Sequence, residues 1–240
     1  MDIKSRAIVL SKLKFKDYDL IVKCYTKHRG AVSYLIKGGL KNSKTAKAKA
    51  VYFQPLSQLQ IEEAYKVSRD LQYLKEVRPE YIYKSLHTNI YKGSIVLFLS
   101  ELLTSVLQEE EKNEALYDYL ESAFQYLDDV EAYSNFHLLF LLRLTQFLGF
   151  YPESSSESYT HFNLMTGQFE SQPSGIYSIS GKNLTLLKDL LGMDFEALQT
   201  IKITAQERQD FLNMLLYYFE LHLGSFRKPK SLKILNEVFH

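Results

Sequence analysis

The chain of 240 residues is 46% hydrophobic and 24% charged, with a formal net charge of +1. These ordinary globular values exclude wholesale disorder and fibrous repeats. The single cysteine, Cys24, excludes an internal disulfide, and the sequence has no CxxC pair for a structural zinc site. No secretory signal follows Met1, and the longest apolar stretch, residues 136–150, is too short to cross a bilayer. We therefore expect a soluble, cytoplasmic protein.

The small net charge conceals an asymmetry along the chain. Residues 1–50 contain thirteen basic and three acidic side chains, a net charge of +10, whereas the remaining residues contain sixteen basic and twenty-five acidic ones, a net charge of −9. A basic segment in an otherwise acidic chain favours a polyanionic partner over a merely solvated lysine-rich surface.

The first 78 residues have the pattern of short β-strands. Residues 3–10 are rich in Ile, Val and Leu, and apolar and polar residues alternate with a period of two in residues 20–26, 32–36 and 58–62. Residues 71–77 are a weaker candidate for a fifth strand. The sequence His28-Arg29-Gly30 predicts a hairpin turn between two of these strands. Five short strands in fewer than 80 residues favour a small barrel over an open sheet.

Beyond residue 79 the spacing of apolar residues becomes helical. The expected helices cover residues 95–107, 116–127 and 136–150. The last of these is apolar on nearly every side, which is typical of a helix at the centre of a bundle. Ser134 is its predicted N-terminal cap, and Gly149 marks its end.

Two further segments complete the helical part. Thr204-Ala205-Gln206-Glu207 has the sequence of a capping box, and the helix that it begins is expected to end at Gly224. Residues at about 153–178, rich in serine and glycine and without cysteine, are expected to form an irregular excursion. The whole pattern predicts an α+β chain, with a β-barrel over residues 1–79 and an all-helical domain over residues 80–240.

The sequence nominates no catalytic residue, metal or cofactor. It contains no GxxxxGK[ST], GxGxxG, GxSxG or HExxH motif. The six histidines show no metal-ligand spacing with acidic residues or with Cys24, and His137 and His222 are expected at the edge of a helical core or at its surface. Cys24 alternates with apolar residues, so we expect a buried thiol.

A lysine-rich run is the positive functional signal. Lys37-Gly38-Gly39-Leu40-Lys41 is followed by further lysines among small and polar residues, a composition that follows a phosphate backbone rather than packing a core. Interleaved aromatic residues are candidates for stacking on bases, although each alone is more often a core residue: Phe15, Tyr18, Tyr25, Tyr34 and Tyr52. The predicted DNA-binding residues are Lys14, Lys16, Arg29, Lys37, Gly38, Lys41, Lys44, Lys47 and Lys49.

Short motifs follow one another in a definite order along nearly the whole chain. In the strand-rich part they are Ala7-Ile8-Val9-Leu10, Tyr18-Asp19-Leu20-Ile21-Val22, Tyr25-Thr26 with Gly30, Lys37-Gly38 with its basic run, and Phe53-Gln54-Pro55-Leu56. In the helical part they are Leu148-Gly149-Phe150-Tyr151-Pro152, His222-Leu223-Gly224 and Pro229-Lys230-Ser231-Leu232. Their order and spacing resemble the bacterial RecO family of DNA repair and recombination mediators.

This resemblance implies an N-terminal OB-fold, a helical C-terminal domain and a non-enzymatic, nucleoid-associated protein. It further implies binding of single- and double-stranded DNA, strand annealing, and recombinase loading together with RecR. The helical domain is expected to contact the acidic tail of single-stranded-DNA-binding protein, with Arg143 as a candidate cation. Many family members carry a four-cysteine zinc module where this chain has residues 154–177 without cysteine, so no metal is expected here.

Two alternatives stay open. One is a protein-only helical adaptor without DNA contact, whose lysine run is merely solvated. The other is a nucleic-acid-processing enzyme whose carboxylates meet only in the fold. A continuous positive face on the barrel favours the mediator, two acidic residues facing each other beside the lysine run favour the enzyme, and a large exposed apolar groove on the helices favours the adaptor.

Overall fold

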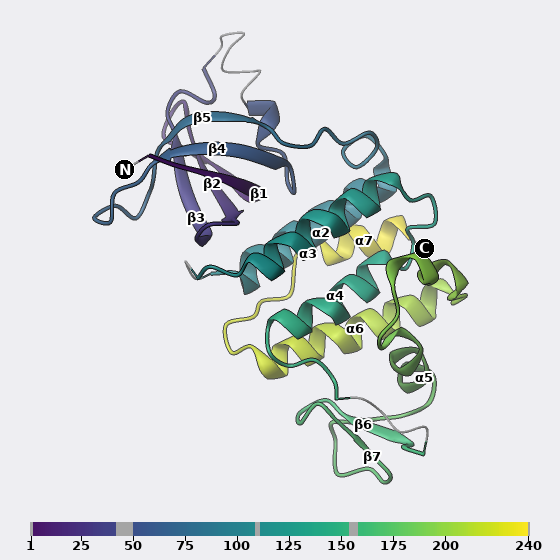
Figure 1. Ribbon diagram of the computed structural model, residues 1–240. Coiled ribbons are helices and arrows are strands. Elements are labelled where there is room, and N and C mark those ends of the chain that lie inside the picture. Colours follow the sequence, from purple (N-terminus) through teal and green to yellow (C-terminus); the bar gives the residue numbers. More distant parts are fainter. Residues whose placement is uncertain (1, 42–49, 109–110, 154–157, 240) are drawn as a thin grey trace. The chain divides into compact units, whose positions relative to one another are not determined.

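The computed structural model describes residues 2–41, 50–108, 111–153 and 158–239 of the chain (Figure 1). The chain divides into two compact units. The first unit comprises the residues up to Asp129 together with Pro229–Ser231, and the second comprises Val130–Lys228 and the chain from Leu232 onward. A five-stranded sheet precedes the helices of the chain that the structure names, which confirms the α+β class. The domain boundary predicted at residue 79 stays a prediction.

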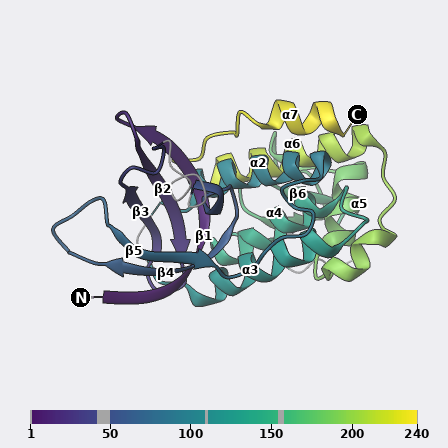
Figure 2. The same cartoon turned by 90° about the horizontal axis from the view of Figure 1, so that it is seen from above.

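The first unit begins with five antiparallel strands. They are β1 (Asp2–Phe15), β2 (Asp19–Thr26), β3 (Gly30–Ile36), β4 (Gln58–Ala64) and β5 (Leu74–Pro79), arranged side by side in the order β3-β2-β1-β4-β5 (Figures 1 and 2). β1 is longer than expected because it serves two partners. Its residues 2–8 pair with β4, and its residues 7–15 pair with β2 across an irregularity between Val9 and Ser11.

The ladder of strands does not close into a complete barrel. Its two edges, β3 and β5, meet through Gln72, which forms an isolated parallel bridge with Tyr34. The backbone N–H of Leu35 donates to the carbonyl of Gln72, and the N–H of Gln72 donates to the carbonyl of Ser33, each at 2.9 Å. The five strands are therefore confirmed, whereas the expected closed barrel is an OB-like sheet whose edges share this bridge.

The core of the sheet explains which aromatic residues are available to a ligand. Its buried cluster consists of Ala7, Val9, Leu20, Val22, Cys24, Val32, Tyr34, Phe53, Leu59 and Ile61. Burial of Cys24 is confirmed, and it raises the pKa of the thiol to about 12. The Tyr34 hydroxyl donates to the Glu63 carboxylate at 3.0 Å, and Tyr25 is also buried. Neither ring is a stacking surface, so those two candidates were wrong.

Two helices complete the bulk of the first unit, α2 (Ile90–Val106) and α3 (Glu114–Asp129). α2 begins at Asn89, whose side chain accepts from the backbone N–H groups of Tyr91 and Lys92, as an N-cap should. α2 also anchors residues from the far end of the sequence, because the Glu101 carboxylate accepts from the backbone N–H groups of Lys230 and Ser231, each at 2.9 Å, and from the Ser231 hydroxyl at 2.6 Å.

The segment between β5 and α2 is fixed to the C-terminal end of α3 by one carboxylate. Asp128, only 2% exposed, accepts from the backbone N–H groups of Lys84, Ser85 and Leu86 at 2.7–2.8 Å. The buried Lys92 ammonium donates to the Asp128 carbonyl at 2.6 Å. Burial alone raises the pKa of Asp128, but the three N–H donors outweigh it and hold that pKa below its ordinary value.

The second unit is mainly helical. It contains α4 (Phe136–Phe147), α5 (Gly181–Leu190), the 3-10 helix η1 (Phe195–Thr200), α6 (Ala205–His222) and α7 (Leu232–Val238). Burial of α4 on nearly every side is confirmed, and so is the capping box of α6, in which the Thr204 hydroxyl accepts from Glu207 N–H and the Glu207 carboxylate accepts from Thr204 N–H. Ser134 was the wrong cap for α4, because Asn135 occupies that position and its side chain bonds Ile201 and Arg208 instead.

The predicted excursion contains a small three-stranded sheet. Its strands are β6 (His161–Asn163), β7 (Gln168–Glu170) and β8 (Ser178–Ile179), in the order β7-β6-β8. The Glu170 carboxylate accepts from Asn163, Ser174 and Ser178 at 2.5–3.1 Å and so ties the strands and their connection together.

His137 lies deep in the core of the second unit rather than at its edge. It is 1% exposed, which corrects the expectation, and it lies beside Phe239 and Arg208. Burial, aided by the positive charge of Arg208, lowers the pKa of His137 to about 3.

We predict that Asp128→Ala destabilises the first unit by about 2–4 kcal/mol, because three N–H groups in buried or partly buried hydrogen bonds lose a charged acceptor. Asp129→Ala is the matched control, since Asp129 is exposed and pairs with exposed Lys84, and should cost under about 1 kcal/mol. Because the folded pKa of Asp128 is lowered, its contribution is present above pH 4 and lost as the pH falls below that value. Urea unfolding at pH 7 and pH 3.5 measures the unfolding free energy of both variants. The difference between the variants should be smaller at pH 3.5, and an equal difference at both pH values would contradict the pH dependence.

We also predict that the neutral His137 makes the second unit sensitive to acid. The unfolded imidazole takes up a proton near pH 6.5, whereas the folded one does so only near pH 3. Stability is therefore complete above pH 6.5 and falls by at most about 1.4 kcal/mol per pH unit between these values. Unfolding free energies of the wild type should show this slope and those of His137→Leu should lack it. Equal slopes would refute the assignment.

Candidate nucleic-acid interface

A basic hollow of about 470 Å³ opens where β1 turns into β2 and where β3 ends. We call it the basic hollow, and its lining residues are Lys16, Asp17, Tyr18, Asp19, Lys37, Gly38 and Lys41. The three lysines are exposed, and the Tyr18 ring is 56% exposed beside them. The hollow thus combines cations with an accessible aromatic surface.

Hydrogen bonds donated by backbone N–H groups hold the two loops of the basic hollow together. The Asp19 carboxylate accepts from Gly38 N–H at 2.7 Å, and the Tyr18 carbonyl accepts from Leu40 N–H at 2.8 Å. Lys41 N–H closes the turn onto the Gly38 carbonyl at 3.0 Å. Gly38 has a φ of +66°, a conformation that residues with a Cβ rarely adopt, so glycine is required at this turn.

The lysines around the basic hollow are not neutralised by carboxylates in the part of the chain that the structure describes. No ion pair there involves Lys14, Lys16, Lys37 or Lys41. Two of these lysines contact aromatic rings instead. Lys16 Nζ lies 5.3 Å from the Phe15 ring centroid, and Lys37 Nζ lies 5.2 Å from that of Tyr73. Their charges remain available to an anionic ligand.

The structure brings together some of the predicted DNA-binding residues. The residues that line the basic hollow are Lys16, Lys37, Gly38 and Lys41. Lys14 is exposed and lies opposite Leu20 in the pairing of β1 with β2. Three further predicted contacts lie outside the described residues: Lys44, Lys47 and Lys49. All of these assignments stay predictions.

Arg29 lies away from the basic hollow. It follows the opposite end of β2, where Thr26 pairs with Gly30, so the length of the strand, roughly 20 Å, separates it from the hollow. Its guanidinium forms an ion pair with the buried Glu63 carboxylate at 3.1 Å and lies 3.8 Å from the Tyr65 ring centroid. As a DNA contact Arg29 stays a prediction, but these contacts give it a role within the sheet.

A second, larger hollow of about 530 Å³ was missed from the sequence. Its basic lining residues are Lys4, Arg6, Lys27, His28, Arg78 and Lys112, and its acidic ones are Glu62, Glu76 and Glu114. The residues come from separate segments, so no local run revealed them. The positive excess of residues 1–50 was the available signal.

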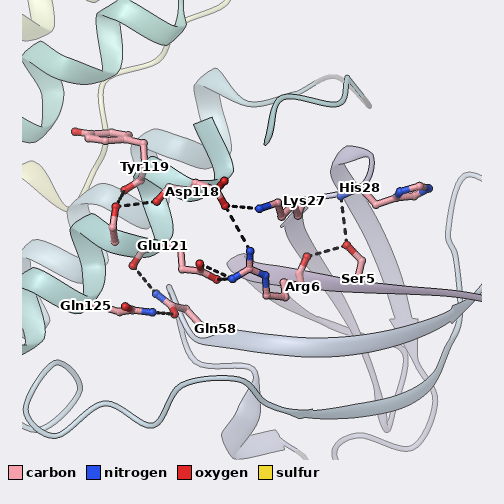
Figure 3. Close-up of polar contacts among 10 residues, drawn as sticks. Ser5, Arg6, Lys27, His28, Gln58, Asp118, Tyr119, Glu121 and Gln125 are labelled. Atoms are coloured by element: carbon pink, nitrogen blue, oxygen red, sulfur yellow. Dashed lines mark hydrogen bonds and ion pairs between the residues drawn. The ribbon is translucent and has the colours of Figure 1, made fainter. Parts of the chain in front are cut away.

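Most cations of this second hollow are already paired. Arg6 donates to both oxygens of Glu121 on α3 at 2.6 and 2.8 Å, and Lys27 donates to Asp118 at 2.6 Å (Figure 3). Lys4 lies 3.6 Å from Glu62, and Lys112 lies 2.6 Å from Glu114. The cations of the second hollow are therefore largely paired, whereas the three lysines of the basic hollow, which Asp17 and Asp19 also line, form no ion pair within the described residues.

In the second unit, Arg143 connects α4 to η1. Its Nη2 donates to the Met193 carbonyl at 2.6 Å and to the Asp194 carboxylate at 2.5 Å, and its guanidinium lies 5.4 Å from the Phe195 ring centroid. As a partner contact Arg143 stays a prediction.

The described ranges contain neither a metal-ligand cluster nor a membrane-spanning helix. No three histidine, cysteine or acidic side chains there lie together as metal ligands. None of the helices in those ranges is long and apolar enough to span a membrane.

Comparison with known proteins places matches along almost the whole chain. The family model described as "Recombination protein O N terminal" matches residues 1–83, and that described as "Recombination protein O C terminal" matches residues 87–233. Proteins named "DNA repair protein RecO" are similar to the chain over its full length and theirs. The one from Christiangramia forsetii is 49% identical over 239 residues, that from Flavobacterium johnsoniae 42% over 239, and that from Porphyromonas gingivalis 30% over 244.

We predict that Gly38→Ala destabilises the first unit by about 1 kcal/mol, because the added Cβ meets a left-handed backbone. Gly93→Ala is the control in the same unit. Gly93 lies within α2, and a Cβ added there would meet no atom of another part of the chain within 4 Å. That substitution should therefore stabilise the unit by about 0.5–1 kcal/mol. Thermal unfolding of both variants measures the two shifts, and shifts of the same sign would refute the account of the turn.

Proposed function

Because the chain belongs to the RecO family, we propose that it acts in recombinational DNA repair as a DNA-binding mediator rather than as an enzyme. In this role it binds single- and double-stranded DNA, anneals complementary strands, and loads recombinase together with RecR. The observation that supports DNA contact is the group of exposed lysines at the basic hollow, which form no ion pair with a carboxylate among the described residues.

The chemistry of the basic hollow suits a phosphate backbone. Lysine ammonium groups attract phosphate as point charges and release counterions, which gives affinity without reading base sequence. The exposed Tyr18 ring offers a surface on which an unpaired base can stack. Lys41 leads directly into Lys44, Lys47 and Lys49, so the lysines along the chain extend the contact.

The enzymatic alternative receives less support from the same site. Asp17 and Asp19 both line the basic hollow, but the Asp19 carboxylate is engaged by Gly38 N–H at 2.7 Å. That contact gives Asp19 a structural role in the turn. The absence of catalysis therefore belongs to this proposal and rests on family membership.

Two protein contacts also belong to the proposal. We expect RecR to be a partner, and we expect the second unit to bind the acidic tail of single-stranded-DNA-binding protein. If Arg143 is the cation for that tail, the tail carboxylates compete with Asp194, which the guanidinium already contacts at 2.5 Å. Calorimetry with a tail peptide tests this contact. Absence of heat at hundreds of micromolar peptide would remove it from the proposal.

We predict that the triple variant Lys16→Ala, Lys37→Ala and Lys41→Ala weakens binding of single-stranded DNA similarly for unrelated sequences. The slope of log K against log salt should flatten by about 0.7 for each phosphate that no longer has a lysine beside it. A second triple variant at Lys44, Lys47 and Lys49 should have the same kind of effect. Fluorescence anisotropy with a labelled oligonucleotide at several salt concentrations measures both quantities.

The matched control removes three exposed lysines of the second unit, Lys202, Lys228 and Lys233, and changes the net charge equally. It should leave affinity and slope close to those of the wild type. Unchanged affinity and slope in folded variants of the basic hollow would remove the hollow from the DNA site. Failure of the wild type to bind DNA would favour the adaptor.

A further inference from the structure

The last part of the chain is attached to both units. Pro229–Ser231 belong to the first unit, whereas the residues before and after them belong to the second. The α7 helix that follows is fixed in the second unit, where its Leu235 is only 1% exposed. The chain therefore passes from one unit to the other three times, after residues 129, 228 and 231.

One carboxylate holds Pro229–Ser231 on α2. Glu101 Oε1 accepts from Lys230 N–H at 2.9 Å, while its Oε2 accepts from Ser231 N–H at 2.9 Å and from the Ser231 hydroxyl at 2.6 Å. Ser231 is only 5% exposed, and Pro229 is also buried. Hydrogen bonds to an ionised acceptor are about twice as strong as those between neutral groups. The attachment of this segment is therefore concentrated on the side chain of Glu101.

The connections on which movement would depend are irregular and exposed. Between α6 and Pro229, residues 224–225 and 227–228 are exposed. In the connection between α3 and α4, residues 131–132 are exposed as well. Exposed connections with little buried apolar surface have low local stability. The bonds to Glu101 can therefore break while the helices of both units stay folded.

We propose that Pro229–Ser231 form a latch, which Glu101 keeps closed on α2. When the latch opens, these three residues leave the first unit, and the connection after residue 129 is then the only one between the units. Each unit can then change its position independently, with that connection as the hinge. The latch goes beyond the proposed DNA-binding function, because none of its residues lines the basic hollow.

Opening of the latch is measured by limited proteolysis with endoproteinase Lys-C, which cuts after lysine. Cleavage after Lys230 requires that the backbone on both sides of that bond leave Glu101, so its rate reports the open population. Glu101→Gln should accelerate this cleavage roughly 10- to 100-fold, the effect of losing one hydrogen bond to a charged acceptor. Glu220→Gln is the matched control, because Glu220 is exposed and pairs with Lys228 at 3.3 Å, and it should be cleaved at the wild-type rate.

Independent movement is measured by pulsed electron paramagnetic resonance with one spin label in each unit. Ala115→Cys on α3 and Asn213→Cys on α6 place the labels at exposed positions, and the buried Cys24 stays unlabelled. The distribution of distances between the labels should be broader with Glu101→Gln than with the wild-type glutamate. The control Glu220→Gln should leave that distribution unchanged.

Ser231→Ala provides a second variant should Glu101→Gln unfold the first unit. It removes the hydroxyl hydrogen bond and keeps the two backbone ones, so both effects should be present and smaller. Equal cleavage rates in folded Glu101→Gln and Glu220→Gln overturn the latch. Faster cleavage without a broader distance distribution overturns the independent movement. Where only Ser231→Ala folds, wild-type values in both measurements overturn the proposal.

Discussion

The pairing of Arg6 with Glu121 determines where the positive charge of the first unit remains available. It attaches β1 to α3 through two hydrogen bonds, and Lys27 joins the same helix through Asp118 (Figure 3). Burial raises the pKa of Glu121, and Arg6 opposes that effect, so the pair is a half-buried one in which each charge depends on the other.

This ion pair and its neighbours make the distribution of unpaired positive charge along the sheet uneven. Of the thirteen basic residues within positions 1–50, Arg6, Lys27 and Arg29 are neutralised by carboxylates near one end of β2, whereas the lysines of the basic hollow surround its other end. Among the described residues, the cations near one end of β2 are thereby paired, while the lysines of the basic hollow at its other end form no ion pair. The net charge of the segment gives no hint of this direction, because the acidic partners follow in the sequence after residue 50.

Local patterns predicted much of the fold, and long-range contacts account for what was missed. Period-two alternation located β2, β3 and β4, but β1 extends to Phe15 because pairing with β2 stabilises exposed residues that do not alternate. The capping box of α6 was readable because both of its partners are three residues apart. Asn135 displaced Ser134 as the cap of α4 because its side chain finds partners in Ile201 and Arg208, which no local pattern reveals. No local pattern reveals the bridge from Gln72 to Tyr34 on β3 either.

The hydrogen bonds that Glu101 accepts from Lys230 and Ser231 affect how the protein folds during its synthesis. Pro229–Ser231 belong to the first unit, although the residues before and after them belong to the second. Glu101 binds the backbone of Lys230 and Ser231, so the carboxylate finds these partners only after residues 230 and 231 have been synthesised. A ribosome making this protein therefore delivers the sheet and α2 before it delivers the segment that completes the first unit. During that interval Glu101 lacks these partners, and the first unit reaches its final form only after Ser231 has been added to the chain.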